Sequence, residues 1–138
     1  MKKEDFYYYY FTEYLAELTK EMFIRKNWCD EDTTYFHTRY LQDLFIAEES
    51  IEKMEQTLGR PLADDECIRV LVGLRKTRIE KSYNFILSNF LEHITEQKSL
   101  NPEDQLKIEK RLLKHKQSYY SLDLLIEMKN IEEEILRR

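Results

Sequence analysis

The three histidines are the first side chains to consider for chemistry, because imidazole serves both as a general base and as a metal ligand. His37, His93 and His115 lie on separate segments of the 138-residue chain. None belongs to an HExxH motif, and the sequence contains no GxSxG elbow and no phosphate-binding P-loop. We therefore predict that the protein is not an enzyme and that it uses no cofactor and no small-molecule substrate.

Carboxylates and thiols offer the other routes to a metal site. Glutamates cluster within residues 48–55, but a carboxylate site in a helical bundle needs a histidine at matching spacing. Cys29 and Cys67 are isolated, without a CxxC pair or a Cys/His cluster. We interpret the glutamates as the polar face of a helix, and we predict no metal site and no disulfide.

One pair of residues on a predicted helix combines a cation with an imidazole. Arg111 and His115 are four residues apart, so they share one helix face. The pair resembles the Arg/His motif of the helical RNases of the HEPN family, in which four to six residues intervene instead of three. The resemblance would imply RNA cleavage, whereas the shorter spacing favours a solvated His115.

The composition indicates which elements position these side chains. The chain has only two glycines and two prolines, and 36% of its residues are charged. All-β folds need many tight turns, which depend on glycine and proline, whereas charged residues suit helices with solvated faces. We predict an all-α protein: a single domain over residues 1–138, folded as a compact bundle of four or five helices.

Apolar residues recur at steps of three and four along four segments. These are predicted at about residues 4–27, 33–58 (capped by Asp32 or Thr33), 62–98 and 102–138. Gly59 and Pro61 form a strong stop signal after the second segment. Asn101 is the predicted N-cap of the fourth, which could run to the C-terminus.

The third segment contains a predicted break near residues 73–77. A single helical phase through GLRKTRIE would place Arg75 or Arg78 in the buried stripe, and an unpaired buried guanidinium is costly. Gly73 weakens a helix by about 1 kcal/mol relative to alanine, and Thr77 can begin a capping box. The alternative is one continuous helix with both arginines on its exposed side.

Residues 64–86 resemble a helix-turn-helix, whose second helix enters the DNA major groove. The resemblance departs at Arg69 and Ser82, where the motif has a small and an apolar residue. The preceding residues 58–66 resemble the entry to a sigma-factor helical domain. The resemblance implies a DNA-binding regulator, the alternative function, with these contacts to phosphates or base edges: Arg75, Lys76, Thr77, Arg78 and Lys81.

Charge is distributed unevenly along the chain. Residues 1–68 contain 8 Lys/Arg and 16 Asp/Glu, whereas residues 69–116 contain 11 Lys/Arg and 6 Asp/Glu. Such asymmetry indicates a nucleic-acid face or complementary self-association. The alternative is that basic and acidic helices neutralise each other within one bundle.

The stretch FYYYYF at residues 6–11 is the most unusual feature of the sequence. At about 100° per residue, its four tyrosines sweep roughly 300° of a helix surface, so one core cannot hold them all. The apolar stripe that continues to Met22 predicts which rings face inward: Tyr7, Tyr10 and Phe11. Because tyrosine is enriched at interfaces, we predict a protein interface at this segment: Tyr7, Tyr8, Tyr9 and Tyr10, with Tyr8 and Tyr9 left outward.

These observations favour a small, non-enzymatic regulatory protein that acts through helix-face contacts. The predicted partner is another protein or a second copy of the chain, as a homodimer, and nucleic acid is the alternative partner. No apolar run approaches the ~20 residues that cross a bilayer, and the N-terminal MKKED lacks the apolar stretch of a secretory signal. We therefore expect a cytoplasmic protein that does not span a membrane.

Overall fold

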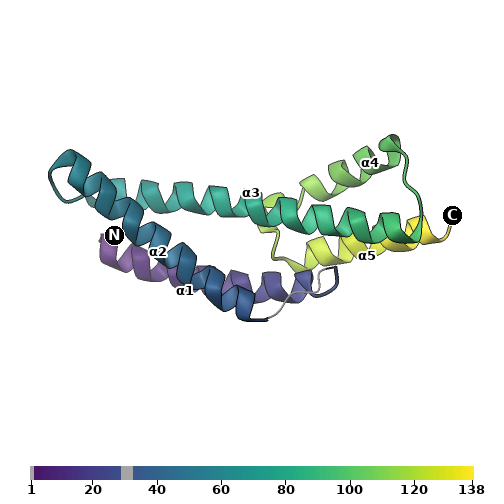
Figure 1. The fold of residues 1–138 in the computed structure, drawn as a ribbon, viewed down its shortest axis with the longest axis horizontal. Helices are drawn as coiled ribbons and strands as arrows, with labels where there is room; N and C mark the ends of the chain where they lie inside the picture. Colours follow the sequence, from purple (N-terminus) through teal and green to yellow (C-terminus); the bar gives the residue numbers. More distant parts are fainter. Residues whose placement is uncertain (1, 29–32) are drawn as a thin grey trace. The chain divides into compact units, whose positions relative to one another are not determined.

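The computed structural model describes residues 2–28 and 33–138, and these residues form helices joined by short connections, without a strand. The helices are α1 (Lys3–Arg25), α2 (Thr33–Leu58), α3 (Asp64–Gln97), α4 (Pro102–Leu113) and α5 (Leu122–Leu136), with a 3-10 turn η1 (Lys116–Ser118) before α5 (Figure 1). The prediction of an all-α helical bundle is confirmed.

The helices form two compact units. Unit 1 comprises Met1–Thr19 and Asp32–Arg78, and unit 2 comprises Lys20–Glu31 and Ile79–Arg138. Helices α1 and α3 therefore contribute residues to both units. Each unit buries apolar residues of its own, so we describe the units one at a time, and the single domain over residues 1–138 stays a prediction.

Unit 1 is built from α1, α2 and the first half of α3. Its buried apolar residues recur at helical spacing on all three elements: Phe11, Tyr14, Leu18, Phe36, Ala47, Leu62, Cys67 and Leu71. Aromatic rings join α1 to α2, since Tyr40 stacks on Tyr14 with 5.8 Å between ring centroids and meets the edge of Phe11 at 6.2 Å. The regular stripe of the sequence thus becomes the inner face of each helix.

The stop signal after α2 is confirmed. Gly59 has φ of +71°, a left-handed conformation that glycine adopts without strain, and its N–H donates to the Glu55 carbonyl at 2.9 Å. Glu66 then fixes the start of α3, because it accepts from Arg60 at 2.9 Å and from the Ala63 N–H at 3.0 Å. These hydrogen bonds lower the pKa of Glu66 to about 2.

Unit 2 contains the larger core. It joins Trp28 to the second half of α3, α4 and α5: Ile79, Tyr83, Ile86, Phe90, Ile94, Ile108, Leu112, Tyr119, Leu124, Met128, Ile131 and Ile135. Trp28 meets Phe90 edge-on at 4.8 Å, and the Lys129 ammonium lies 4.7 Å from the Trp28 ring. Not every apolar residue of the C-terminal segment enters this core, because Leu106, Leu113, Leu122 and Ile126 are exposed.

The predicted continuation of the fourth helix to the C-terminus is wrong. The N-cap is confirmed, because Asn101 Oδ1 accepts from the Asp104 N–H at 2.8 Å, but α4 ends at Leu113. Ser121 caps a new helix by accepting from the Asp123 N–H at 3.1 Å. The turn lets two neighbouring apolar stripes face each other across an antiparallel α4–α5 pair, which one straight helix could not achieve.

The predicted break near residues 73–77 is also wrong. Helix α3 runs from Asp64 to Gln97 without interruption, and Thr77 donates to the Gly73 carbonyl at 3.2 Å as a mid-helix residue. The glycine turn expected for the helix-turn-helix resemblance is therefore not formed. Arg75 and Arg78 are tolerated in a single helical phase because carboxylates of α1 and α2 pair with them, as described below.

Two further predictions concern residues outside the described ranges and the lack of a membrane-spanning helix. Asp32, one of the two predicted caps of α2, and Cys29 lie outside the described residues. Within residues 2–28 and 33–138, no helix combines the length and the apolar character needed to cross a membrane.

Candidate interaction faces

The N-terminal tyrosines divide as the helical sweep predicts. Tyr8 and Tyr9 are 75% and 52% exposed, whereas Tyr7 and Tyr10 are half-buried and Phe11 is buried. Tyr7 donates to Glu48 of α2 at 3.3 Å, and both burial and that carboxylate raise its pKa. Burial raises the pKa of Tyr10 to about 12. The inner pair of tyrosines thus holds α1 in unit 1, and the outer pair faces solvent.

The outward tyrosines belong to a longer uncharged face of α1. Tyr8, Thr12, Leu15 and Thr19 follow one another at steps of four, three and four residues, and all four are exposed. Thr12 donates to the Tyr8 carbonyl at 2.8 Å and Thr19 to the Leu15 carbonyl at 2.9 Å. Both threonine hydroxyls therefore donate to carbonyls of their own helix, and the face carries no charged group. Ala16 and Tyr9 border it, and we call it the uncharged face of α1.

Tyr9 differs from its neighbour because it has a partner on the same helix. Its hydroxyl donates to Glu13 at 2.7 Å, and this hydrogen bond to a carboxylate raises the pKa of Tyr9. The contact holds the Tyr9 ring along α1 beside the uncharged face. Tyr8 is the more exposed of the two outward tyrosines.

The residues predicted to contact nucleic acid are not gathered into one accessible cluster. Arg75 donates to Glu17 of α1 at 2.6 Å through Nη2, and Arg78 donates to Asp43 of α2 at 2.9 and 2.6 Å. Both guanidiniums therefore face carboxylates of unit 1 across the helix bundle. The others are exposed on α3: Lys76, Thr77 and Lys81.

Asp43 is the centre of this polar network in unit 1. Besides Arg78, it accepts a hydrogen bond from the Tyr14 hydroxyl and lies 3.9 Å from Arg39, whose side chain is 3% exposed. Arg39 also donates to the Tyr14 hydroxyl at 3.3 Å. Sequence periodicity could not reveal this network, because its members lie on three helices and only the fold brings them together.

The histidines are dispersed. His37 is exposed on α2, while His93 on α3 contacts Glu132 of α5 through Nε2 at 2.6 Å. His115 is half-buried at the N-cap position of η1, where its side chain makes no capping hydrogen bond. Among the residues that the structure describes, no three His, Cys, Asp or Glu side chains are placed to hold a metal ion. Cys67 is buried in unit 1.

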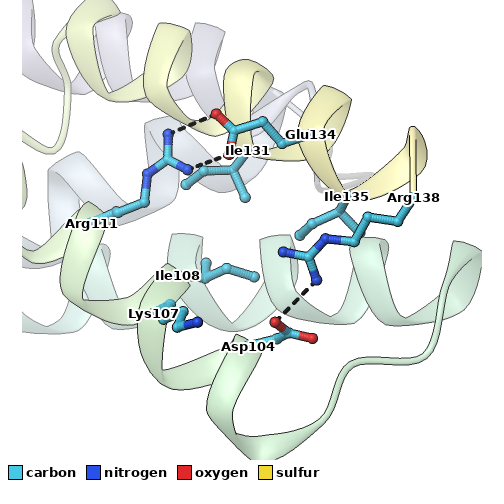
Figure 2. Close-up of a pocket in the computed structure, with 8 residues that line it drawn as sticks. All are labelled: Asp104, Lys107, Ile108, Arg111, Ile131, Glu134, Ile135 and Arg138. Atoms are coloured by element: carbon cyan, nitrogen blue, oxygen red, sulfur yellow. Dashed lines mark hydrogen bonds and ion pairs between the residues drawn. The ribbon is translucent and has the colours of Figure 1, made fainter.

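Arg111, the cation of the Arg/His pair, is directed to α5. It donates to Glu127 at 2.7 Å through Nε. It also donates to Glu134 at 2.6 Å through Nη1 (Figure 2). The two carboxylates raise the pKa of the guanidinium. Arg111 therefore fastens the α4–α5 pair, and its charge is already matched by protein groups.

The hollow between α4 and α5 has a volume of about 200 Å³. Figure 2 shows its lining, with isoleucines between two bridging arginines: Asp104, Lys107, Ile108, Arg111, Ile131, Glu134, Ile135 and Arg138. Arg138 closes one end by an ion pair with Asp104 at 3.0 Å, and Arg111 closes the other with Glu134. Both arginines are therefore paired with carboxylates across the hollow, and their charges are matched by protein groups.

Comparison with known proteins gives this chain no relative. No protein-family description, no curated protein and no solved structure matches it.

Proposed function

We propose that the chain is a non-enzymatic interaction protein of the cytoplasm that associates with a second copy of itself through the uncharged face of α1. The observation that carries the proposal is the composition of this face. In a chain with 36% charged residues, four exposed positions over three helical turns carry no charge.

The spacing of the face supports contact with another helix. Steps of four, three and four residues are those of the a and d positions of a helix–helix seam. From Tyr8 to Thr19 the face is about 16 Å long, at about 1.5 Å per residue. A partner helix can therefore bury it along its whole length.

The order of side-chain sizes supports a second copy as that partner. If two α1 helices pair antiparallel, Tyr8 lies opposite Thr19 of the second copy, and Thr12 lies opposite Leu15. Each large side chain then meets a threonine, which allows close packing of the two helices. A parallel pair would place Tyr8 against Tyr8 and leave Thr12 against Thr12.

The DNA-binding alternative has weaker support. The ion pairs of Arg75 and Arg78 occupy two of its five predicted contacts, and α3 lacks the turn that would present a reading helix. Lys76 and Lys81 remain exposed, but two cations give a small electrostatic footprint on a chain whose net charge is −5.

The proposal is tested by changing Tyr8 and Tyr9 to serine and measuring molar mass by size-exclusion chromatography with light scattering. We expect the unmodified chain to elute as a dimer and Tyr8→Ser/Tyr9→Ser to shift toward the 17.0 kDa monomer. Changing two exposed α5 residues, Leu122 and Ile126, to serine is the matched control and should leave the mass unchanged. An unchanged mass in the tyrosine variant would contradict the proposed role of the face.

A further inference from the structure

His93 of α3 lies at a contact between three elements of unit 2. Its Nε2 atom is 2.6 Å from a carboxylate oxygen of Glu132 on α5, and the contact is partly buried. Its ring also meets Trp28, in the segment that follows α1, with 5.1 Å between the ring centroids and 65° between the ring planes. His93 therefore joins α3 both to α5 and to Trp28.

The two polar neighbours of Nε2 favour opposite states of this atom. An ionised carboxylate only accepts hydrogen bonds, so Glu132 favours an Nε2 that carries a proton. The amide nitrogen of Gln97, which only donates, lies 2.8 Å from the same Nε2 atom and favours an Nε2 without a proton. A neutral imidazole carries one ring proton, so it satisfies one of these neighbours at the expense of the other.

A second ring proton removes this competition. Both nitrogens of an imidazolium carry N–H, so Nε2 then donates to Glu132 and the Gln97 amide nitrogen is excluded as its partner. The contact becomes a charge-assisted hydrogen bond, which is roughly twice as strong as a neutral one. Imidazole is the side chain that ordinarily changes its charge between about pH 5 and about pH 8. Acidification within that range should therefore strengthen the contact between α3 and α5.

The charged groups around the imidazole favour the same direction. On α5, Glu132 touches the ring directly and attracts an imidazolium, whereas the Lys129 ammonium lies 4.7 Å from the Trp28 ring and opposes a second positive charge there. The direct contact is the stronger of the two. On α3, Glu92 and Glu96 are exposed and add an attraction that salt screens. Three further acids follow Trp28 in the sequence and lie outside the described residues: Asp30, Glu31 and Asp32.

We propose that His93 is a pH-sensitive switch within unit 2. The neutral ring is shared between Glu132 and Gln97, whereas the imidazolium binds Glu132 alone and places a positive charge against Trp28, within the separation of about 6 Å at which cations attract aromatic rings. The proton comes from solvent, and no covalent bond of the chain other than N–H changes. The switch is independent of the proposed self-association through α1, so either can fail without the other.

Trp28 supplies the readout, because it is the only tryptophan of the chain. An imidazolium in contact with an indole ring quenches its fluorescence, so we expect the emission to fall in one transition between about pH 8 and about pH 5. His93→Gln keeps an amide that can donate to Glu132 but does not titrate, and we expect it to abolish the transition. His37→Gln changes an exposed histidine of α2 and is the matched control, which should keep the transition.

Glu132→Gln tests the partner of the switch. The substitution keeps a hydrogen-bond acceptor and removes the negative charge, so we expect the midpoint of the Trp28 transition to move to lower pH by about one unit. Glu133→Gln makes the same chemical change at an exposed neighbour on α5, and its midpoint should match that of the unmodified chain. Circular dichroism at neutral pH confirms that each variant is folded.

The outcomes separate the switch from an ordinary surface titration. A transition that persists in His93→Gln would mean that another group titrates beside Trp28. Equal midpoints for Glu132→Gln and Glu133→Gln would mean that Glu132 does not hold the imidazolium. Constant emission from the unmodified chain over the whole pH range would mean that no charge arrives at the indole ring. Each of these results overturns the proposal.

Discussion

At the scale of single residues, unit 1 is held by polar groups whose partners lie far away in the sequence. Asp43 accepts from Arg78 and Tyr14 and lies beside Arg39, so one carboxylate serves α1, α2 and α3 together. A lone buried arginine would be costly, which is the correct part of the sequence argument about residues 73–77. The incorrect part was to assume that no carboxylate would meet it.

Removing the charge of Asp43 tests this network. We expect Asp43→Asn to lower the free energy of unfolding by about 3 kcal/mol, because Arg39 and Arg78 then lose the carboxylate that they share. Urea denaturation followed by circular dichroism measures the change. The exposed pair Glu49–Lys53 offers the control, since Glu49→Gln should cost less than about 1 kcal/mol. Equal costs for the two variants would contradict the role of Asp43.

Tyr83 in unit 2 differs from Asp43 in the hydrogen bonding of its polar group. Its ring is buried in the core, but its hydroxyl has no hydrogen-bond partner in the part of the chain that the structure describes. A buried hydroxyl without a partner costs about 1–3 kcal/mol. We therefore expect Tyr83→Phe to keep or raise the free energy of unfolding at neutral pH. A loss above about 1 kcal/mol would reveal a hydrogen bond to this hydroxyl.

The same substitution has a pH dependence with a definite sign. Burial raises the pKa of Tyr83 to about 12, from 10.0 for an ordinary tyrosine. Since the folded pKa is the higher one, the stabilising contribution is complete below pH 10 and is lost as pH rises toward 12. Between pH 9 and a pH above 11, the denaturation midpoint should therefore fall less in Tyr83→Phe than in the unmodified chain, because phenylalanine has no hydroxyl to ionise.

At the scale of elements, the helix end predicted at Gly59 and the helix start predicted at Asn101 are confirmed, whereas the start predicted at Thr77 is wrong. Gly59 and Asn101 act through their own backbone or side chain, so local sequence suffices to place them. The continuity of α3 depends on partners from α1 and α2, and the turn after Leu113 depends on packing of α5 against α4. Tertiary contacts determine both the continuity of α3 and the position of this turn, so the spacing of apolar residues alone could not predict either.

The two glycines give an element-scale test. Gly73 lies inside α3, and a Cβ there would meet nothing within 4 Å, so Gly73→Ala should raise the free energy of unfolding by about 1 kcal/mol. Gly59 has a positive φ that disfavours a Cβ, so Gly59→Ala should lower it by about 1 kcal/mol. Thermal or urea denaturation separates the two signs. Destabilisation by Gly73→Ala would favour the turn that the helix-turn-helix resemblance requires.

At the scale of the whole molecule, the uncharged face of α1 carries the functional argument. The direction of Tyr8 and Tyr9 followed from the sweep of FYYYYF, so this much of the candidate site was predictable. The exposure of other apolar residues, such as Phe45 and Leu113, was not predictable, because the sequence does not show which of them the core leaves out. Only packing distinguishes them from their buried neighbours.

Sedimentation equilibrium of the unmodified chain tests the central claim of self-association most directly. A dilution series at about 0.1 M and about 1 M salt separates this uncharged contact from charge-driven association, which screening weakens. We predict a weight-average mass that approaches twice 17.0 kDa at high protein concentration and falls on dilution, in both salts alike. A mass of 17.0 kDa at every concentration in both salts would contradict the account.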